Sequence, residues 1–149
     1  MSDWLEHSEQ VEVPVPVATA WDLWSNLELM PQWMNWIDSV EVLTEKPDLS
    51  RWTLSGGGLT FTWLSRILKE VPHQIIQWES VDGLPNQGAI RFYDRKDNHS
   101  IVKLTVAYKI PGIVGSLMDN LFLGKLVESN LRDDLNRFRE YALQHPGTP

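Results

Sequence analysis

The chain has 149 residues, a formal net charge of −7 and 42% hydrophobic residues, which suits a single globular domain spanning residues 1–149. Its acidic character argues against nucleic-acid binding, because that function usually shows a basic patch. The absence of cysteine excludes disulfides, thiolate catalysis and cysteine-based metal sites.

The first third of the chain predicts one strand and two short helices. Val11, Val13 and Val15 alternate with polar residues and proline over residues 10–15, which is the pattern of a half-buried strand. Residues 18–27 then change to helical spacing. Residues 30–34 predict a second short helix, with Pro31 in its first turn.

Six further strand-like runs follow, separated by turn residues. They span residues 39–44, 50–55, 59–70, 74–80, 87–95 and 100–110. Consecutive hairpins imply an antiparallel meander. The alternation within the runs places apolar side chains on one face, as with Phe61, Trp63 and Ile67 in the longest run.

The C-terminal part predicts one long amphipathic helix over residues 113–144. One face of this helix has residues three or four positions apart, and all but Glu128 are apolar or small: Leu117, Leu121, Gly124, Glu128, Leu131, Leu135, Phe138 and Ala142. We expect the paired acids Asp133 and Asp134 on its solvated side. Such a helix needs a large apolar surface to cover, and a one-sided sheet offers that surface. We therefore predict an α+β fold in which a curved antiparallel sheet of about seven strands surrounds the helix.

Eight tryptophans are the unusual feature of the composition. Tryptophan contributes a large apolar area and one N–H group that needs a partner when it is buried. Two interpretations stay open at this point, a core rich in tryptophan and a pocket lined by aromatic side chains.

Four stretches resemble the helix-grip fold of the START-like superfamily. They are residues 13–21 at the first strand-to-helix junction, 30–33 in the second short helix, 78–83 with 86–88 around the fifth turn, and 108–112 before the last helix. Within this superfamily the chain is most similar to bacterial polyketide cyclase/dehydrase and coenzyme Q-binding START-like proteins. The resemblance covers nearly the whole chain and implies an internal cavity. It does not specify the activity, because the fold serves carriers, sensors and enzymes.

The histidines do not form a recognisable catalytic or metal-binding pattern. His7, His73, His99 and His145 fall in a lead-in, two turns and the tail, so we expect them to be solvated and expect no metal site. The nucleophile pattern Gly-x-Ser-x-Gly is absent. We therefore predict no catalytic residue and no cofactor.

The inward phase of the strands, combined with the helix, predicts the wall of a ligand cavity. The predicted wall residues are Trp33, Phe61, Trp63, Ile76, Trp78, Phe92, Val106, Tyr108, Met118, Leu121 and Phe122. We expect Met30, Trp33 and Met34 to guard the mouth. The inward hydroxyls of Ser65, Ser80 and Tyr108 either bind a ligand oxygen or are satisfied within the protein.

These features favour binding or transport of a small hydrophobic ligand, such as a lipid, quinone, isoprenoid or polyketide. One alternative is a polyketide cyclase/dehydrase, which substrate turnover or a buried acid–base pair would indicate. Another is a partner-binding module with a collapsed cavity, which a void too small for a ligand would indicate. We expect a monomer or weak dimer without a nucleic-acid partner.

The sequence also bears on location. No run reaches the ~18 apolar residues that a membrane span needs, and the first residues lack the basic and apolar regions of a signal peptide. We therefore expect a cytoplasmic protein without a transmembrane segment, and transient membrane contact stays open.

Overall fold

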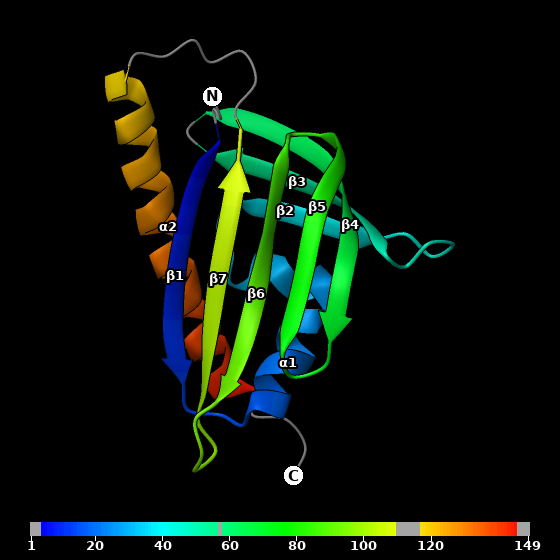
Figure 1. Cartoon of the computed structure of the whole chain (residues 1–149), viewed down its shortest axis with the longest axis vertical. Helices are drawn as coiled ribbons and strands as arrows, with labels where there is room; N and C mark the ends of the chain where they lie inside the picture. The colour runs from blue at the N-terminus through cyan, green and yellow to red at the C-terminus, as the bar shows by residue number, and fades with distance from the viewer. Residues whose placement is uncertain (1–3, 57, 110–116, 146–149) are drawn as a thin grey trace.

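The computed structural model describes residues 4–56, 58–109 and 117–145, and within the last range it describes the side chains from Leu123 onward. The elements in chain order are β1 (Leu5–Val13), α1 (Val17–Ser25), the 3-10 helix η1 (Leu27–Gln32), β2 (Ile37–Val42), β3 (Leu49–Gly56), β4 (Leu59–Val71), β5 (Ile75–Gly83), β6 (Asn86–Asp94), β7 (Ser100–Tyr108) and α2 (Leu117–Gln144). Figure 1 shows the strands joined in one curved sheet, with α2 running along it.

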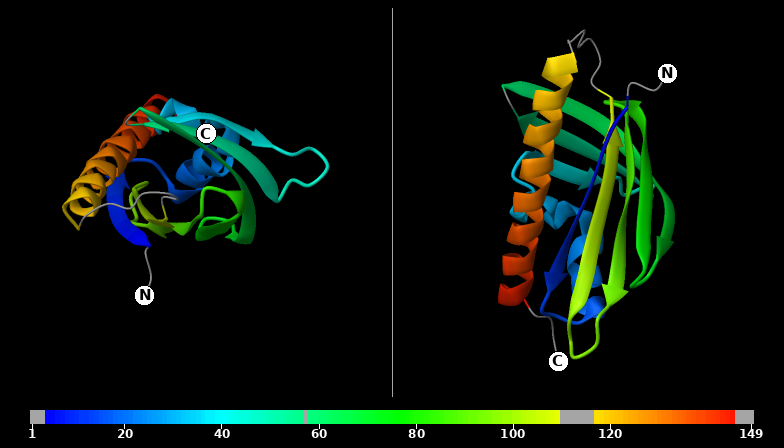
Figure 2. Two further views of the ribbon diagram at one scale, coloured as in Figure 1. Left: turned by 90° about the horizontal axis from the view of Figure 1, so that it is seen from above. Right: turned by 60° about the vertical axis from the view of Figure 1, so that its left-hand side comes forward.

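The sheet is antiparallel throughout and has seven strands in the order β1-β7-β6-β5-β4-β3-β2. The strands from β2 to β7 form consecutive hairpins, whereas β1 pairs with β7 at the other edge. Figure 2 shows the sheet bending so that α2 lies on its concave side. The predicted α+β helix-grip fold, with a curved antiparallel sheet around the C-terminal helix, is confirmed.

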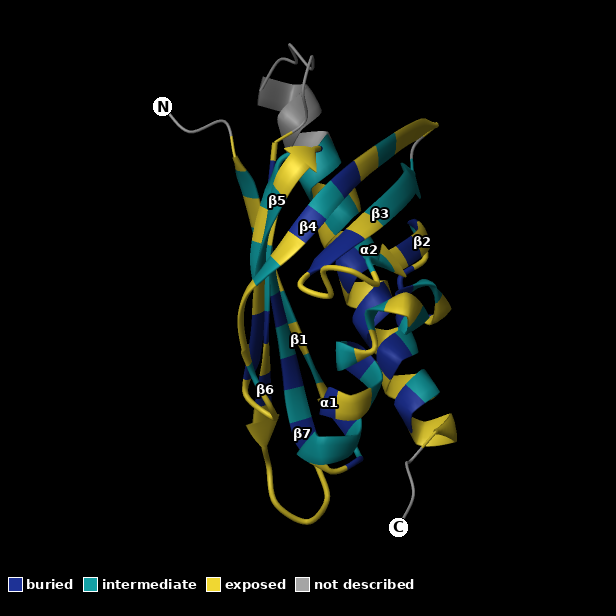
Figure 3. Cartoon of the chain, turned by 90° about the vertical axis from the view of Figure 1, so that its right-hand side faces the viewer, coloured by how far each residue is buried: buried dark blue, intermediate teal, exposed yellow. Residues whose placement is uncertain are grey.

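The apolar faces of the sheet and the helix meet as the alternation predicts. Figure 3 shows bands of buried and exposed residues along the strands. On β4, Trp63 and Ser65 are buried between the exposed Thr62 and Arg66. On α2 the predicted stripe is buried at Leu131, Leu135, Phe138 and Ala142. The described helices include none that is long and apolar enough to span a membrane.

Strand β1 begins at Leu5, well before the predicted start at residue 10, and it pairs with β7 along its whole length. The sequence pattern missed this extension because two half-buried positions carry polar residues. Both find partners in the structure: His7 contacts Tyr108, and Glu9 accepts a hydrogen bond of 3.1 Å from Arg132 of α2.

The helix boundaries differ from the prediction in two places. The second short helix is the 3-10 helix η1, which begins and ends earlier than the predicted residues 30–34, so Pro31 lies near its end. The predicted start of the long helix at residue 113 lies outside the described residues, while its end at Gln144 agrees with the prediction.

An aromatic cluster fills the core between α1, η1 and the second half of α2. The ring of Trp33, which is 0% exposed, lies 5.5 Å from that of Trp24, 5.0 Å from that of Phe138 and 5.3 Å from that of Tyr141. These separations are typical of favourable aromatic pairs. The cluster anchors α2 at one end of the sheet.

Candidate ligand-binding cavity

A cavity of about 420 Å³ lies between the concave face of the sheet and α2. Side chains from η1, strands β3 to β7 and α2 line it, and nearly all of them are apolar or aromatic. Its volume falls within the range of about 300–1,000 Å³ that is typical of small-molecule sites. The cavity is therefore large enough for a ligand, which argues against the alternative of a partner-binding module with a collapsed cavity.

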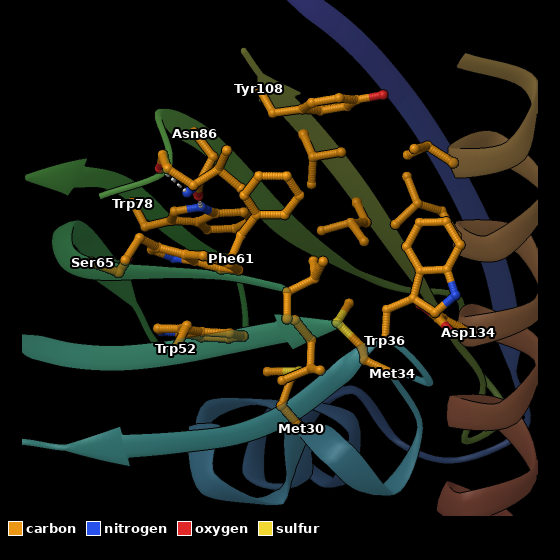
Figure 4. A pocket seen from close by; sticks show the side chains of 18 of the residues that line it. Met30, Met34, Trp36, Trp52, Phe61, Ser65, Trp78, Asn86, Tyr108 and Asp134 are labelled. Atoms are coloured by element: carbon orange, nitrogen blue, oxygen red, sulfur yellow. Dashed lines mark hydrogen bonds between the residues drawn. The ribbon is translucent and has the colours of Figure 1, made fainter. Parts of the chain in front are cut away.

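Six of the predicted wall residues line this cavity. They are Phe61, Trp63, Ile76, Trp78, Val106 and Tyr108. They come from three strands, β4, β5 and β7, and they converge because the antiparallel register places the inward positions of neighbouring strands side by side. Figure 4 shows Phe61 and Trp78 on one side of the cavity and Tyr108 on another. Whether these side chains contact a ligand stays a prediction.

Trp33 and Phe92 lie away from the cavity lining, which corrects their predicted placement. Trp33 belongs to the aromatic cluster with Trp24 and Phe138. Phe92 points from β6 toward α1, where its ring lies 5.2 Å from that of Trp21. The inward phase was assigned correctly for Phe92, but α1 covers that part of the concave face. Met118, Leu121 and Phe122 lie in α2 before the described side chains begin, so their predicted role falls outside the described residues.

The mouth of the cavity differs from the predicted one. Met30 and Met34 line the cavity, but they are only 2% and 9% exposed, so they close its inner end. The exposed lining residues are Leu59, at the start of β4, and Leu126 of α2. The exposed part of the wall therefore lies at the β3–β4 hairpin and the first half of α2.

Two tryptophans that the sequence pattern did not assign to the wall, Trp36 and Trp52, also line the cavity. Trp52 of β3 lies opposite Trp63 of β4, and the two rings stack at 5.8 Å with 13° between their planes. The sequence pattern could have placed Trp52 in the wall, because Ser50, Trp52 and Leu54 are alternate residues of β3 and therefore share one face of the sheet. Both interpretations of the tryptophan content therefore hold, one for the aromatic cluster and the other for the cavity.

Two glycines make room for aromatic side chains of the wall. A Cβ atom added to Gly88 would lie 2.7 Å from Trp78 and 2.3 Å from the carbonyl oxygen of Thr105. A Cβ added to Gly56 would lie 2.8 Å from the ring of Trp36. All three distances are below van der Waals contact, so the rings of Trp78 and Trp36 pack directly against glycine backbone.

Trp78 is held further by the turn between β5 and β6. Its indole N–H donates to Oδ1 of Asn86 at 3.2 Å, and Nδ2 of Asn86 donates to the carbonyl oxygen of Leu84 at 2.9 Å. The hydroxyl of Ser80, one of the predicted ligand-binding candidates, accepts the Asn86 backbone N–H at 3.0 Å. The Ser80 hydroxyl thus stabilises the turn, which agrees with the alternative that it is satisfied within the protein.

Tyr108 is the last residue of β7, and its side chain is buried in the wall. Its hydroxyl lies 3.2 Å from Nε2 of His7, and the two rings stack at 5.8 Å with 24° between their planes. Burial raises the pKa of Tyr108 to about 12. The expectation that His7 is solvated was wrong, because β1 extends far enough to bring its side chain onto Tyr108. His73, His99 and His145 are exposed, as expected.

Asp134 lines the cavity and is 2% exposed, which corrects its predicted place on the solvated side of α2. It lies three residues after Leu131 and four before Phe138, so it belongs to the buried stripe. Its carboxylate accepts hydrogen bonds from the Asn35 backbone N–H at 3.1 Å and from the Asn130 side chain at 3.3 Å.

The carboxylate of Asp134 also pairs with Arg137, whose Nε donates to the carbonyl oxygen of Trp33 at 3.0 Å. Burial raises the pKa of Asp134, against the opposing effects of Asn35 and Arg137. These contacts connect α2 to the loop between η1 and β2. The described residues include no group of three or more histidine or acidic side chains placed to hold a metal ion.

The fold and the apolar cavity together define a helix-grip domain, the class of protein that encloses small hydrophobic molecules. Residues 13–139 match the family model described as polyketide cyclase/dehydrase and lipid transport. The chain therefore belongs to this family.

Two other proteins resemble the chain in sequence or in fold. The chain is 28% identical over 134 residues to a 17.2 kDa protein of Streptomyces lincolnensis, covering 89% of this chain and 86% of the relative. A protein of Thermus thermophilus superposes with a TM-score of 0.83 at 20% identity, covering 96% of this chain and 100% of the other.

Two further solved structures share the fold. The Zhui aromatase/cyclase of a Streptomyces species gives a TM-score of 0.79 at 19% identity, covering 97% of each chain. A START superfamily protein of Mycobacterium smegmatis gives 0.73 at 15% identity, covering 91% of this chain and 98% of the other. At these identities the likeness concerns the fold alone.

Proposed function

We propose that this protein binds and carries a small hydrophobic molecule in the cavity between its sheet and α2. The observation that supports the proposal most directly is an apolar void of about 420 Å³ in an otherwise closely packed domain. Protein interiors rarely retain voids larger than a water molecule, because each void forfeits packing energy. A cavity of this size is consistent with selection for an occupant.

The lining favours a flat lipophile such as a quinone, a polyketide, an isoprenoid or a lipid chain with a ring. The stacked Trp52 and Trp63 present broad apolar faces, and Trp78 is fixed by Asn86 and Gly88. Met30 and Met34 at the inner end are flexible enough to adapt to different shapes. We assign ligand contact to the lining residues on β4 to β7 and to these aromatic and methionine side chains.

The cysteine-free composition suits a reducing compartment. We therefore place the binding function in the cytoplasm, with the protein acting as a monomer or weak dimer.

A cavity-filling substitution tests the proposal. Ser65 is 4% exposed and faces the cavity from the middle of β4, so Ser65→Phe should occupy the void. The wild type should bind N-phenyl-1-naphthylamine with a rise in probe fluorescence, and Ser65→Phe should reduce the affinity at least tenfold, or about 1.4 kcal/mol. Its thermal unfolding should stay cooperative, because the added ring enters existing space.

Arg66→Phe is the matched control, since Arg66 is the next residue on β4 and is exposed on the other face of the sheet. This variant should bind the probe as the wild type does. Equal probe binding by the wild type and Ser65→Phe would refute carriage in this cavity.

The second candidate function is a polyketide cyclase/dehydrase, and the buried Asp134 in the cavity wall favours it. A carboxyl group with a raised pKa beside a bound substrate is suited to general acid–base catalysis. Incubation with a model poly-β-ketone thioester, followed by product analysis, tests this candidate. An enzyme should give cyclised or dehydrated products that Asp134→Asn no longer forms, whereas a carrier should return the compound unchanged.

A further inference from the structure

Tyr108 differs from Ser50 and Asn86, two other polar residues of the cavity wall, in how its hydrogen bonds are used. Among the described lining residues, the hydroxyl of Ser50 accepts the Trp52 indole N–H at 2.8 Å, and the amide of Asn86 binds Trp78 and Leu84. These groups hold the wall in place. Tyr108 instead contacts His7, a ring nitrogen that can donate or accept according to its tautomer.

The position of Tyr108 suits contact with a ligand. Its ring forms part of the lining, and Figure 4 shows its hydroxyl directed toward α2 rather than into the cluster around Trp78. The ring of His7 stacks beside it from β1 and also approaches α2, where its Cε1 would lie 3.6 Å from a Cβ added to Gly124. His7 and Tyr108 therefore come from the two neighbouring strands β1 and β7, and the stacking of their rings fixes their relative position.

The chemistry of the pair favours donation to the ligand. Burial raises the pKa of Tyr108 to about 12, so the phenol keeps its proton under physiological conditions. When Nε2 of His7 carries a proton, it donates to the Tyr108 oxygen, and the Tyr108 O–H remains free to donate onward. Consecutive hydrogen bonds in a medium of low dielectric polarise one another, which strengthens the final donor.

We propose that Tyr108, positioned by His7, determines the specificity of the cavity by donating a hydrogen bond to a carbonyl oxygen of the ligand. This inference rests on the proposed carrier function and narrows its ligand class to flat lipophiles that bear a ketone, quinone or ester oxygen. A carbonyl oxygen requires only a donor, so one hydrogen bond satisfies it in an otherwise apolar cavity.

Two ligands of nearly the same shape test the inference. Menadione and 2-methylnaphthalene share a flat methylated bicyclic frame, but only menadione carries carbonyl oxygens. Their affinities are measured by displacement of N-phenyl-1-naphthylamine, and the readout is the ratio of the menadione affinity to the 2-methylnaphthalene affinity. Tyr108→Phe keeps the ring and removes the hydroxyl, so it should lower this ratio by roughly threefold to tenfold, the contribution of one hydrogen bond.

The second variant, His7→Phe, keeps a ring beside Tyr108 and removes the nitrogen. It should lower the same ratio by a smaller factor and leave the affinity for 2-methylnaphthalene unchanged, which a general structural defect would not do. Ser8→Ala is the control, because Ser8 follows His7 on β1 but is exposed outside the cavity, and its hydroxyl contacts that of Thr105 at 3.1 Å instead of the pair. Its ratio should match that of the wild type.

The outcomes separate this inference from the proposed function. If the wild type binds neither compound, the carrier function fails. If it binds both and Tyr108→Phe leaves the ratio unchanged, the carrier function stands and the carbonyl contact is refuted. A fall in the ratio for Ser8→Ala equal to that for Tyr108→Phe would also refute it. Tenfold or stronger preference of the wild type for 2-methylnaphthalene would refute the carbonyl contact by itself. In that case a hydrogen bond from Tyr108 would offset none of the cost of burying the menadione oxygens.

Discussion

Two leucines on α2 allow the cavity to be detected by stability alone. Leu131 and Leu135 lie one turn apart and are 8% and 1% exposed, but only Leu131 lines the cavity. Truncation to alanine removes three carbon groups from either side chain, which costs ~2.4 kcal/mol of transfer free energy at ~0.8 kcal/mol per group. At Leu135 the removed atoms leave a new void in packed core, which adds ~1–2 kcal/mol at ~24 cal/mol per Å³.

Leu135→Ala should therefore lower the free energy of unfolding by about 4 kcal/mol, and Leu131→Ala by about 2 kcal/mol. The difference arises because Leu131 already borders empty space, so its truncation enlarges a void instead of creating one. Urea unfolding with linear extrapolation measures both values on protein stripped of lipophiles. A cost for Leu131→Ala equal to or above that for Leu135→Ala would refute an unfilled cavity at this wall. Costs under about 0.5 kcal/mol for both would mean that neither leucine is in the core.

Two further predictions concern the cavity wall. The raised pKa of Asp134 means that the folded state holds this proton to higher pH than the unfolded state, so ionisation of Asp134 opposes folding. Wild type should therefore lose stability relative to Asp134→Asn as pH rises from about 3.8 through the raised pKa, and the difference in their free energies of unfolding should then stay level. Urea melts of both proteins across this pH range measure the difference. A relative stability of the wild type that rises with pH would contradict the prediction. Gly88→Ala should destabilise the protein by ~1–3 kcal/mol and alter the fluorescence of Trp78, because its Cβ would meet the Trp78 ring and a backbone oxygen. Ala89→Val on the outer side of β6 is the control, and equal effects of the two variants would count against the close packing of Gly88.

The periodicity of apolar residues was sufficient to predict the architecture and many of the residues in the cavity wall. The alternation on β4 placed Trp63 inward, the phase of β7 placed Tyr108 inward, and the helical stripe identified Leu135 and Phe138. These assignments depend only on local geometry, because side chains alternate on a strand and recur every three to four residues on a helix.

The errors arose where tertiary contacts decide the environment of a residue. Phe92 has the correct phase, but α1 covers it, and no local pattern states which part of a concave sheet a helix covers. Asp134 has the spacing of a buried residue, but its charge predicted a solvated position. The structure buries it because Asn35, Asn130 and Arg137 satisfy its carboxylate. His7 was missed for a related reason, since its partner is remote in sequence and β1 had to be extended to reach it.

Occupancy of the cavity by a small hydrophobic molecule is measured most directly by native mass spectrometry of the protein purified from its own cells, followed by solvent extraction and identification of the released compound. We predict a mass increment that corresponds to one lipophile per chain, present in the wild type and in Arg66→Phe and depleted in Ser65→Phe. A wild-type protein that carries no extractable compound, and whose cavity takes up no lipophile on subsequent titration, would contradict the proposed carrier function.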